Sequence, residues 1–108
     1  MTFSNQKQEN QEQEISQPPN ELISFIQKTE RYLDQVVEHG NDQQLFIASY
    51  LQGHFAVVAG QSQVQQMTLI EQLAKLMNTS LTAAFENKEL ALDDQDQVLY
   101  LWKTLQAN

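Results

Sequence analysis

The sequence predicts an all-α protein, an antiparallel four-helix bundle preceded by a disordered N-terminal tail. Apolar side chains recur at spacings of three and four residues in four successive segments after residue 20. Capping residues and glycines lie between these segments, and no segment shows the sustained two-residue alternation of a strand. We therefore assign residues 20–108 to one helical domain and residues 1–19 to the tail.

The tail is rich in Gln and Glu, and only Met1, Phe3 and Ile15 offer apolar side chains for burial. Such a segment cannot offset the conformational entropy that it would lose on ordering, so we expect it to be disordered. Pro18 and Pro19 mark its end.

The first helix is predicted over residues 21–39. Asn20 can cap its N-terminus, and an apolar stripe runs from Leu22 to Val37. Gly40 is expected to end this helix in the left-handed conformation.

The second helix is predicted over residues 42–59. Asn41 and Gln44 can form a capping box at its start, and Gly60 is expected to end it. Apolar side chains cover nearly every side of this helix. We therefore expect it to lie at the centre of the domain or to contact a second chain.

The third helix is predicted to follow a capping box of Ser62 and Gln65 and to end near residue 86. Residues 78–80 are poor helix formers. The apolar stripe continues in phase through them, so we predict one helix.

The fourth helix follows a connection over residues 87–92. Asp93 or Asp94 is expected to cap it, with Asp96 or Gln97 as the answering residue three positions later. Its predicted buried stripe is Val98, Leu101, Trp102 and Leu105. Leu99 and Tyr100 would form a contact patch if they remain exposed beside Trp102.

The charge balance disfavours several classes of partner. The chain carries six Lys and Arg against 14 Asp and Glu, a net charge of −8 at pH 7. We therefore expect no nucleic acid and no anionic membrane as partner, since both require a basic surface. No apolar run reaches the length of a membrane span, and the N-terminus lacks the apolar segment of a secretory signal. These features and the absence of cysteine favour a cytoplasmic protein.

No metal ion or cofactor is expected. The acidic run at residues 93–96 lacks the glycine and glutamate that an EF-hand calcium loop requires. The two histidines form neither a zinc motif nor a di-iron motif. Ser49 and His54 point in different directions from one helix, so they cannot act together as nucleophile and base.

His54 is the most informative residue, because helical projection places it among the apolar side chains of the second helix. A buried polar group without a hydrogen-bond partner costs about 1–3 kcal/mol. One interpretation is a core histidine bonded to Tyr50, to a backbone carbonyl or to a carboxylate of another helix. The others are a polar anchor at an interface, and a group that transfers protons or binds a metal.

Gly53 lies in the middle of the same helix, where glycine costs about 1 kcal/mol relative to alanine. Close approach of another backbone is the expected reason, and a groove for a ligand is the alternative. Tyr50, Gly53 and His54 together form the candidate functional or structural polar site.

The segment around these residues resembles the signature of the YfcL-like family of small bacterial proteins. The resemblance rests on Asp42-Gln43-Gln44-Leu45-Phe46, Ser49-Tyr50-Leu51-Gln52-Gly53-His54, Ser80-Leu81, Glu89-Leu90, Asp94-Gln95 and Trp102. It extends over about residues 20–106 and is weak across residues 61–79. Ala91-Leu92 stand where the family pattern has Ser-Pro. The resemblance implies a bacterial, cytosolic protein and brings no reaction, cofactor or partner with it.

Three functional hypotheses follow. The nearly all-apolar second helix, without a complete catalytic set, favours a non-enzymatic domain that binds another protein or itself. The alternative is a small-molecule or ion-binding domain, with or without enzymatic activity, whose pocket lies between helices near Tyr50, Gly53 and His54. The third is a pH-responsive bundle, based on His54 in apolar surroundings.

Overall fold

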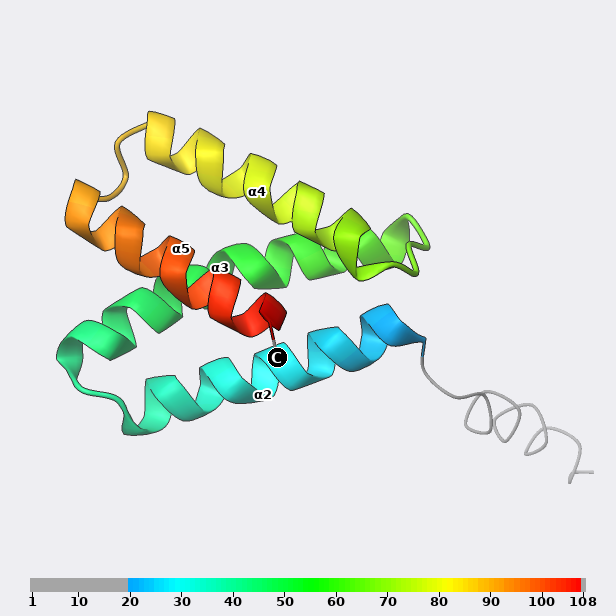
Figure 1. Ribbon diagram of the computed structural model, residues 1–108, viewed down its shortest axis with the longest axis horizontal. Coiled ribbons are helices and arrows are strands. Elements are labelled where there is room, and N and C mark those ends of the chain that lie inside the picture. The colour runs from blue at the N-terminus through cyan, green and yellow to red at the C-terminus, as the bar shows by residue number, and fades with distance from the viewer. Residues whose placement is uncertain (1–19, 108) are drawn as a thin grey trace, which may run out of the picture.

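The computed structural model describes residues 20–107, which form four α-helices (Figure 1). The helices are α2 (Glu21–His39), α3 (Asp42–Val64), α4 (Ile70–Glu86) and α5 (Leu92–Ala107). Consecutive helices run in opposite directions, which confirms the predicted antiparallel bundle. The prediction of a disordered tail over residues 1–19 lies outside the described residues.

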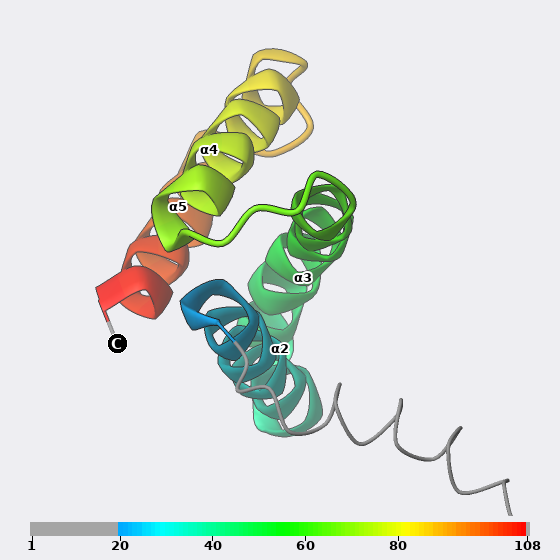
Figure 2. The ribbon, with the colours of Figure 1, turned by 90° about the vertical axis from the view of Figure 1, so that its right-hand side faces the viewer.

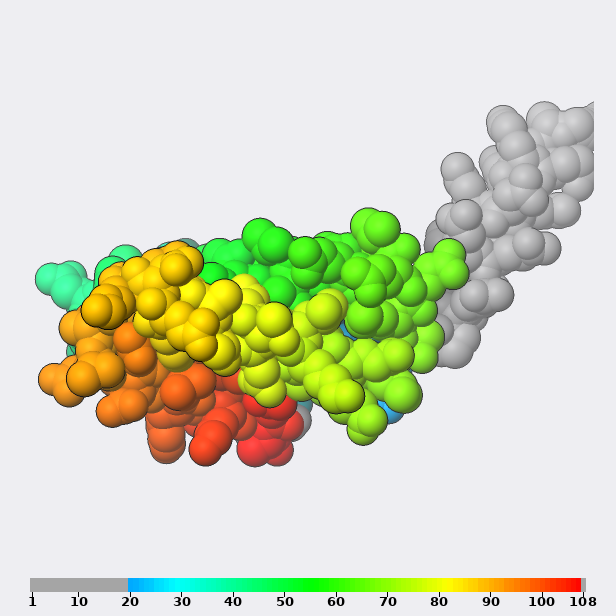
Figure 3. Space-filling model, turned by 90° about the horizontal axis from the view of Figure 1, so that it is seen from above, coloured from blue at the N-terminus to red at the C-terminus, as the bar shows by residue number. Residues whose placement is uncertain are grey.

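The second predicted helix, α3, is central, as its sequence indicates. It contacts each of α2, α4 and α5. In Figure 2, α4 and α5 lie on one side of α3, and no described helix covers the opposite side. The space-filling view shows α4 in front, with α3 along one edge and α5 along the other (Figure 3).

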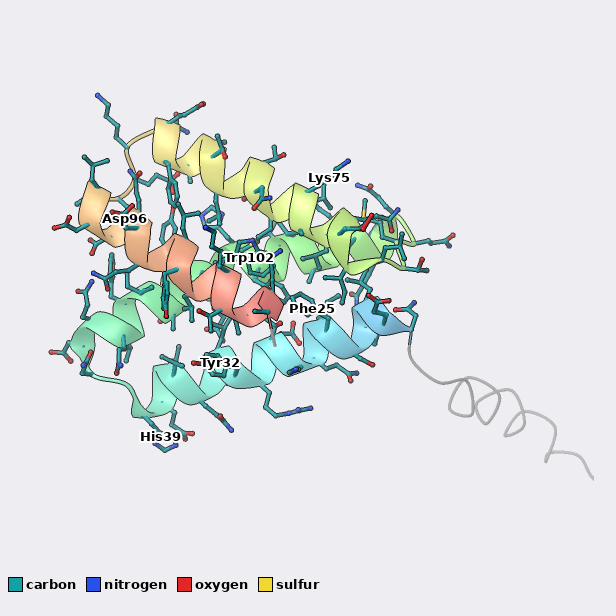
Figure 4. All side chains as sticks on the ribbon, viewed as in Figure 1. Phe25, Tyr32, His39, Lys75, Asp96 and Trp102 are labelled. Carbon is teal, nitrogen blue, oxygen red and sulfur yellow. The ribbon has the colours of Figure 1, made fainter. Side chains whose placement is uncertain are left out.

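An aromatic cluster joins three of the helices in the core. The ring centroid of Trp102 lies 6.1 Å from that of Phe25 and 6.0 Å from that of Phe55, and the two phenylalanine centroids are 6.3 Å apart. Figure 4 shows Trp102 and Phe25 between α5 and α2. The indole nitrogen of Trp102 donates to Oδ1 of Asn78 (3.3 Å), which links α5 to α4. Burial of these rings attaches α5 to α2 and α3 through Trp102.

The first two N-terminal caps are confirmed. Oδ1 of Asn20 accepts a hydrogen bond from the backbone N–H of Ile23 (2.8 Å). Asn41 and Gln44 form the complete capping box, with each side chain accepting from the other residue's backbone N–H at 2.8 and 2.9 Å. These bonds satisfy N–H groups that have no partner within the helix.

The predicted end of the second helix is wrong. α3 continues through Gly60, and Ser62 lies buried inside it, donating its hydroxyl to the carbonyl of Ala59 (2.8 Å). A glycine inside a helix costs only about 1 kcal/mol. Burial of Val58 and Ala59 in the core outweighs that cost.

The predicted capping box of Ser62 and Gln65 is therefore wrong as well. The chain turns after α3 at Gln66, whose φ of 59° is left-handed, a conformation that the identity of this residue does not signal. At the start of α4, Oε1 of Gln72 accepts from the backbone N–H of Leu69 (3.0 Å). From there α4 runs as one helix through residues 78–80, as predicted.

Gly40 ends α2, but not in the predicted left-handed conformation. Its φ is −76° and its ψ is 165°, which is extended backbone. Its N–H donates to the carbonyl of Val36 (2.7 Å), and a Cβ atom at this position would lie 2.7 Å from that same oxygen. Close backbone approach, rather than positive φ, is thus the reason for glycine here.

The predicted cap of the fourth helix is also wrong, because α5 begins at Leu92 and places Asp93 and Asp94 in its first turn. Asp94 instead accepts a hydrogen bond from Gln43 of α3 (2.9 Å). A tertiary contact therefore occupies the side chain that the sequence assigns to a cap.

Candidate functional site

His54 lies half-buried on α3 and bonds to a neighbouring helix. Its Nδ1 atom is 2.8 Å from Oγ of Ser80 in α4. When the Ser80 hydroxyl donates to Nδ1, the proton of the neutral imidazole lies on Nε2. Nε2 is 4.0 Å from Oε1 of Glu89, which lies in the connection between α4 and α5. The hydrogen-bond partner of His54 is thus a serine hydroxyl, which is none of the three partners expected from the sequence.

Tyr50 lies one turn before His54 and contacts it through the ring rather than through a hydrogen bond. The two ring centroids are 4.8 Å apart. The Tyr50 hydroxyl donates to Oε1 of Glu89 (2.9 Å). Burial, which is the largest cause, acts together with the hydrogen bond to Glu89 and the negative charge of that carboxylate to raise the pKa of Tyr50 from 10.0 to about 12. Tyr50 therefore remains a hydrogen-bond donor at neutral pH.

Glu89→Gln is expected to lower the pKa of Tyr50 from about 12 part of the way towards its ordinary value of 10.0, because the substitution removes a negative charge beside the phenol. Folding favours the protonated phenol. The stability that Tyr50 contributes is thus complete below pH 10 and is lost as the pH rises through about 12. Spectrophotometric titration of tyrosinate in the wild type, Glu89→Gln and Tyr50→Phe would check this. Identical curves for all three would contradict it.

Gly53 does not pack closely against another element, so the close-approach interpretation is wrong for the described chain. A Cβ atom at Gly53 would meet no heavy atom within 4 Å. Gly53 instead lines a shallow hollow of about 540 Å³ together with Tyr50, His54, Val57 and Ser80. The glycine adds no side chain to this hollow.

Ser80, His54 and Glu89 are the residue types of a hydrolytic triad, but their arrangement does not complete one. Ser80 lies in the middle of α4, where backbone N–H groups donate within the helix and are not free to stabilise an oxyanion. Oε1 of Glu89 already accepts from Tyr50. The cluster therefore serves as a polar seam between α3, α4 and the connection to α5.

Within residues 20–107, no group of three His, Cys, Asp or Glu side chains could hold an ion.

None of the helices in that range has both the length and the apolar content needed to cross a bilayer.

The structure brings together two residues that were not singled out for chemistry, Ser80 and Glu89. Ser80 lies 26 residues after His54, and Glu89 lies further along the chain. Helical spacing could not predict their contacts with His54, because neither residue belongs to the helix of His54. The available signal was the family resemblance, which includes both Ser80-Leu81 and Glu89-Leu90.

Comparison with protein families identifies the family of this chain. Residues 23–107 match the model of the family described as YfcL protein. Neither the curated proteins nor the solved structures gave a match.

Proposed function

The chain belongs to the YfcL protein family, and we propose that it is a non-enzymatic helical domain that associates with a second copy of itself through the outer face of α3. This outer face is defined by Phe46, Ser49, Gly53, Ala56, Val57, Gly60 and Val64, all of which are exposed. The observation that carries the proposal is that residues 43–64 include no Asp, Glu, Lys or Arg. A helix that only covers a core normally turns charged or polar side chains outward.

Apolar side chains stand exposed on this outer face. Val57 is 62 % exposed and Val64 is 84 % exposed, and Phe46 is exposed as well. Figure 2 shows the side of α3 that no described helix covers. Exposed apolar side chains that gather on one face of a helix are typical of an interaction site.

The two glycines of the outer face support close helix packing. Gly53 and Gly60 each have no heavy atom within 4 Å of a Cβ position, so alanine would fit at both and would be more stable by about 0.5–1 kcal/mol. Packing inside the described chain does not explain these glycines. Close approach of a helix from another molecule does, since small residues allow two backbones to come near each other.

A second copy fits this surface because of charge and shape. Two chains of net charge −8 repel one another, so they associate most readily where the surface is uncharged. Val57 lies one helical turn after Gly53, where no side chain occupies the surface. In an antiparallel pair of α3 helices related by a two-fold axis, Val57 of each copy packs over Gly53 of the other.

Sedimentation equilibrium or size exclusion with light scattering tests this proposal. We expect concentration-dependent self-association, which Val57→Lys weakens by about tenfold or more because it places two like charges in the interface. Leu92→Lys is the matched control, since Leu92 is 76 % exposed and lies on α5. A wild type that stays monomeric at every concentration, or equal effects of the two variants, would contradict the proposal.

The second candidate is a small-molecule or ion-binding domain, and the polar pair of His54 and Ser80 beside the hollow favours it. A thermal-shift screen with metal ions and metabolites separates the two functions. Stabilisation of a monomeric wild type that is lost in folded His54→Ala would support ligand binding over self-association.

A further inference from the structure

A separate groove lies between α2, α3 and α5, with a volume of about 370 Å³. Each helix contributes one aliphatic side chain to its lining: Val36, Ile47 and Leu101. Two tyrosines also line it, Tyr32 from α2 and Tyr100 from α5. Tyr100 is 75 % exposed, so the groove combines an apolar lining with an accessible aromatic edge.

The charged lining of the groove is acidic. Asp96 lines it from α5 (Figure 4). The amide of Gln43 donates to Asp94 (2.9 Å) and to Gln97 (3.2 Å), and Gln97 also lines the groove, so the carboxylate of Asp94 is held nearby. Among the described residues that line the groove, none is Lys, Arg or His. The local potential therefore favours a cation.

We infer that this groove binds a segment of a partner protein that carries an apolar anchor side chain flanked by Lys or Arg. The anchor enters between Val36, Ile47 and Leu101, because the volume accommodates side chains rather than a whole helix. The flanking cation meets the carboxylate of Asp96 and the ring of Tyr100 or Tyr32. Tyrosine rims around an apolar centre are common in protein interfaces.

Charge decides between this occupant and the others. An acidic segment is repelled by Asp94 and Asp96, and a second copy of this chain, with its net charge of −8, is disfavoured in the same way. The groove shares no lining residue with the outer face of α3. The inference therefore goes beyond self-association and does not depend on it.

The test uses the full chain and two synthetic amphipathic peptides as probes. Both peptides carry the same Trp and Leu anchors; one has Lys and the other Glu at the remaining positions. By fluorescence anisotropy, we expect the Lys peptide to bind at least about tenfold more tightly than the Glu peptide.

Variants locate the binding to the groove. Asp96→Lys is expected to weaken binding of the Lys peptide by about tenfold or more. Glu71→Lys, which makes the same change of charge at an exposed position in the first turn of α4, should change it by less than about threefold. Tyr100→Ser is expected to weaken binding of the Lys peptide more than Leu92→Ser does. Leu92 is a matched control because it is 76 % exposed and Tyr100 is 75 % exposed.

The inference would be overturned by no binding of the Lys peptide, by equal binding of the two peptides, or by equal effects of Asp96→Lys and Glu71→Lys. Loss of self-association in Tyr100→Ser would assign the groove to a second copy and overturn it as well. Peptide binding that persists in Val57→Lys supports the inference and keeps it distinct from self-association through α3. Circular dichroism verifies that each variant is folded.

Discussion

Trp102→Ala is expected to lower the free energy of unfolding by about 3–5 kcal/mol. Trp102 is only 2 % exposed, and its ring packs against Phe25 of α2 and Phe55 of α3. Alanine would leave a cavity where three helices meet and would remove the hydrogen bond to Asn78 of α4. Much of the attachment of α5 to the rest of the bundle is lost with this one side chain.

Urea denaturation followed by circular dichroism measures this loss. The far-ultraviolet signal is required because Trp102 is the single tryptophan of the chain, so its fluorescence disappears with the substitution. Tyr100→Ala is the matched control on the same helix. Its side chain is 75 % exposed, and we expect a change within about 0.5 kcal/mol. Equal stability of Trp102→Ala and the wild type would show that α5 does not pack on the bundle through this residue.

Gly53→Gln is expected to change two quantities in opposite directions. The free energy of unfolding of the monomer rises by about 0.5–1 kcal/mol, since glutamine is a good helix former and a Cβ atom at this position meets no heavy atom within 4 Å. Self-association weakens by about thirtyfold or more, because disruption at the centre of an interface costs about 2 kcal/mol or more. A substitution that stabilises the fold and weakens the assembly separates the two roles of α3.

Denaturation at low protein concentration and sedimentation at high concentration measure the two effects of Gly53→Gln separately. Ala83→Gln, at an exposed position of α4, is the control and should change neither. If Gly53→Gln lowers the free energy of unfolding of the monomer, other atoms must occupy the space around Gly53 in solution, and the first part of the prediction is wrong. If it leaves self-association unchanged, the outer face of α3 is not the interface.

The existence of the four helices follows from interactions between residues close in the sequence. The apolar stripe of α2 depends on spacings of three and four residues, and the caps at Asn20 and Asn41 each bond to an N–H three positions away. The central place of α3 was also predictable, because a helix that is apolar on nearly all sides needs partners on several of them.

The end of α3 was not predictable in this way. Gly60 is a local signal for a helix end, but its cost of about 1 kcal/mol is small beside the burial of neighbouring side chains. Whether Ala59 and Ser62 are buried depends on how α3 packs against the other helices. The same reasoning applies to Asp94, whose side chain bonds to Gln43, 51 residues earlier, instead of capping α5.

The residues of the candidate site could be predicted from the sequence only in part. Gly53 and His54 stand out from the sequence because each is unusual for its position on an apolar helix, and helical geometry places Tyr50 about one turn from His54. The partners of His54 were decided only when α4 packed against α3 and carried Ser80 to within 2.8 Å of its ring. Spacing along the chain determines which residues share a helix face, whereas contacts between faces depend on the packing of the whole bundle.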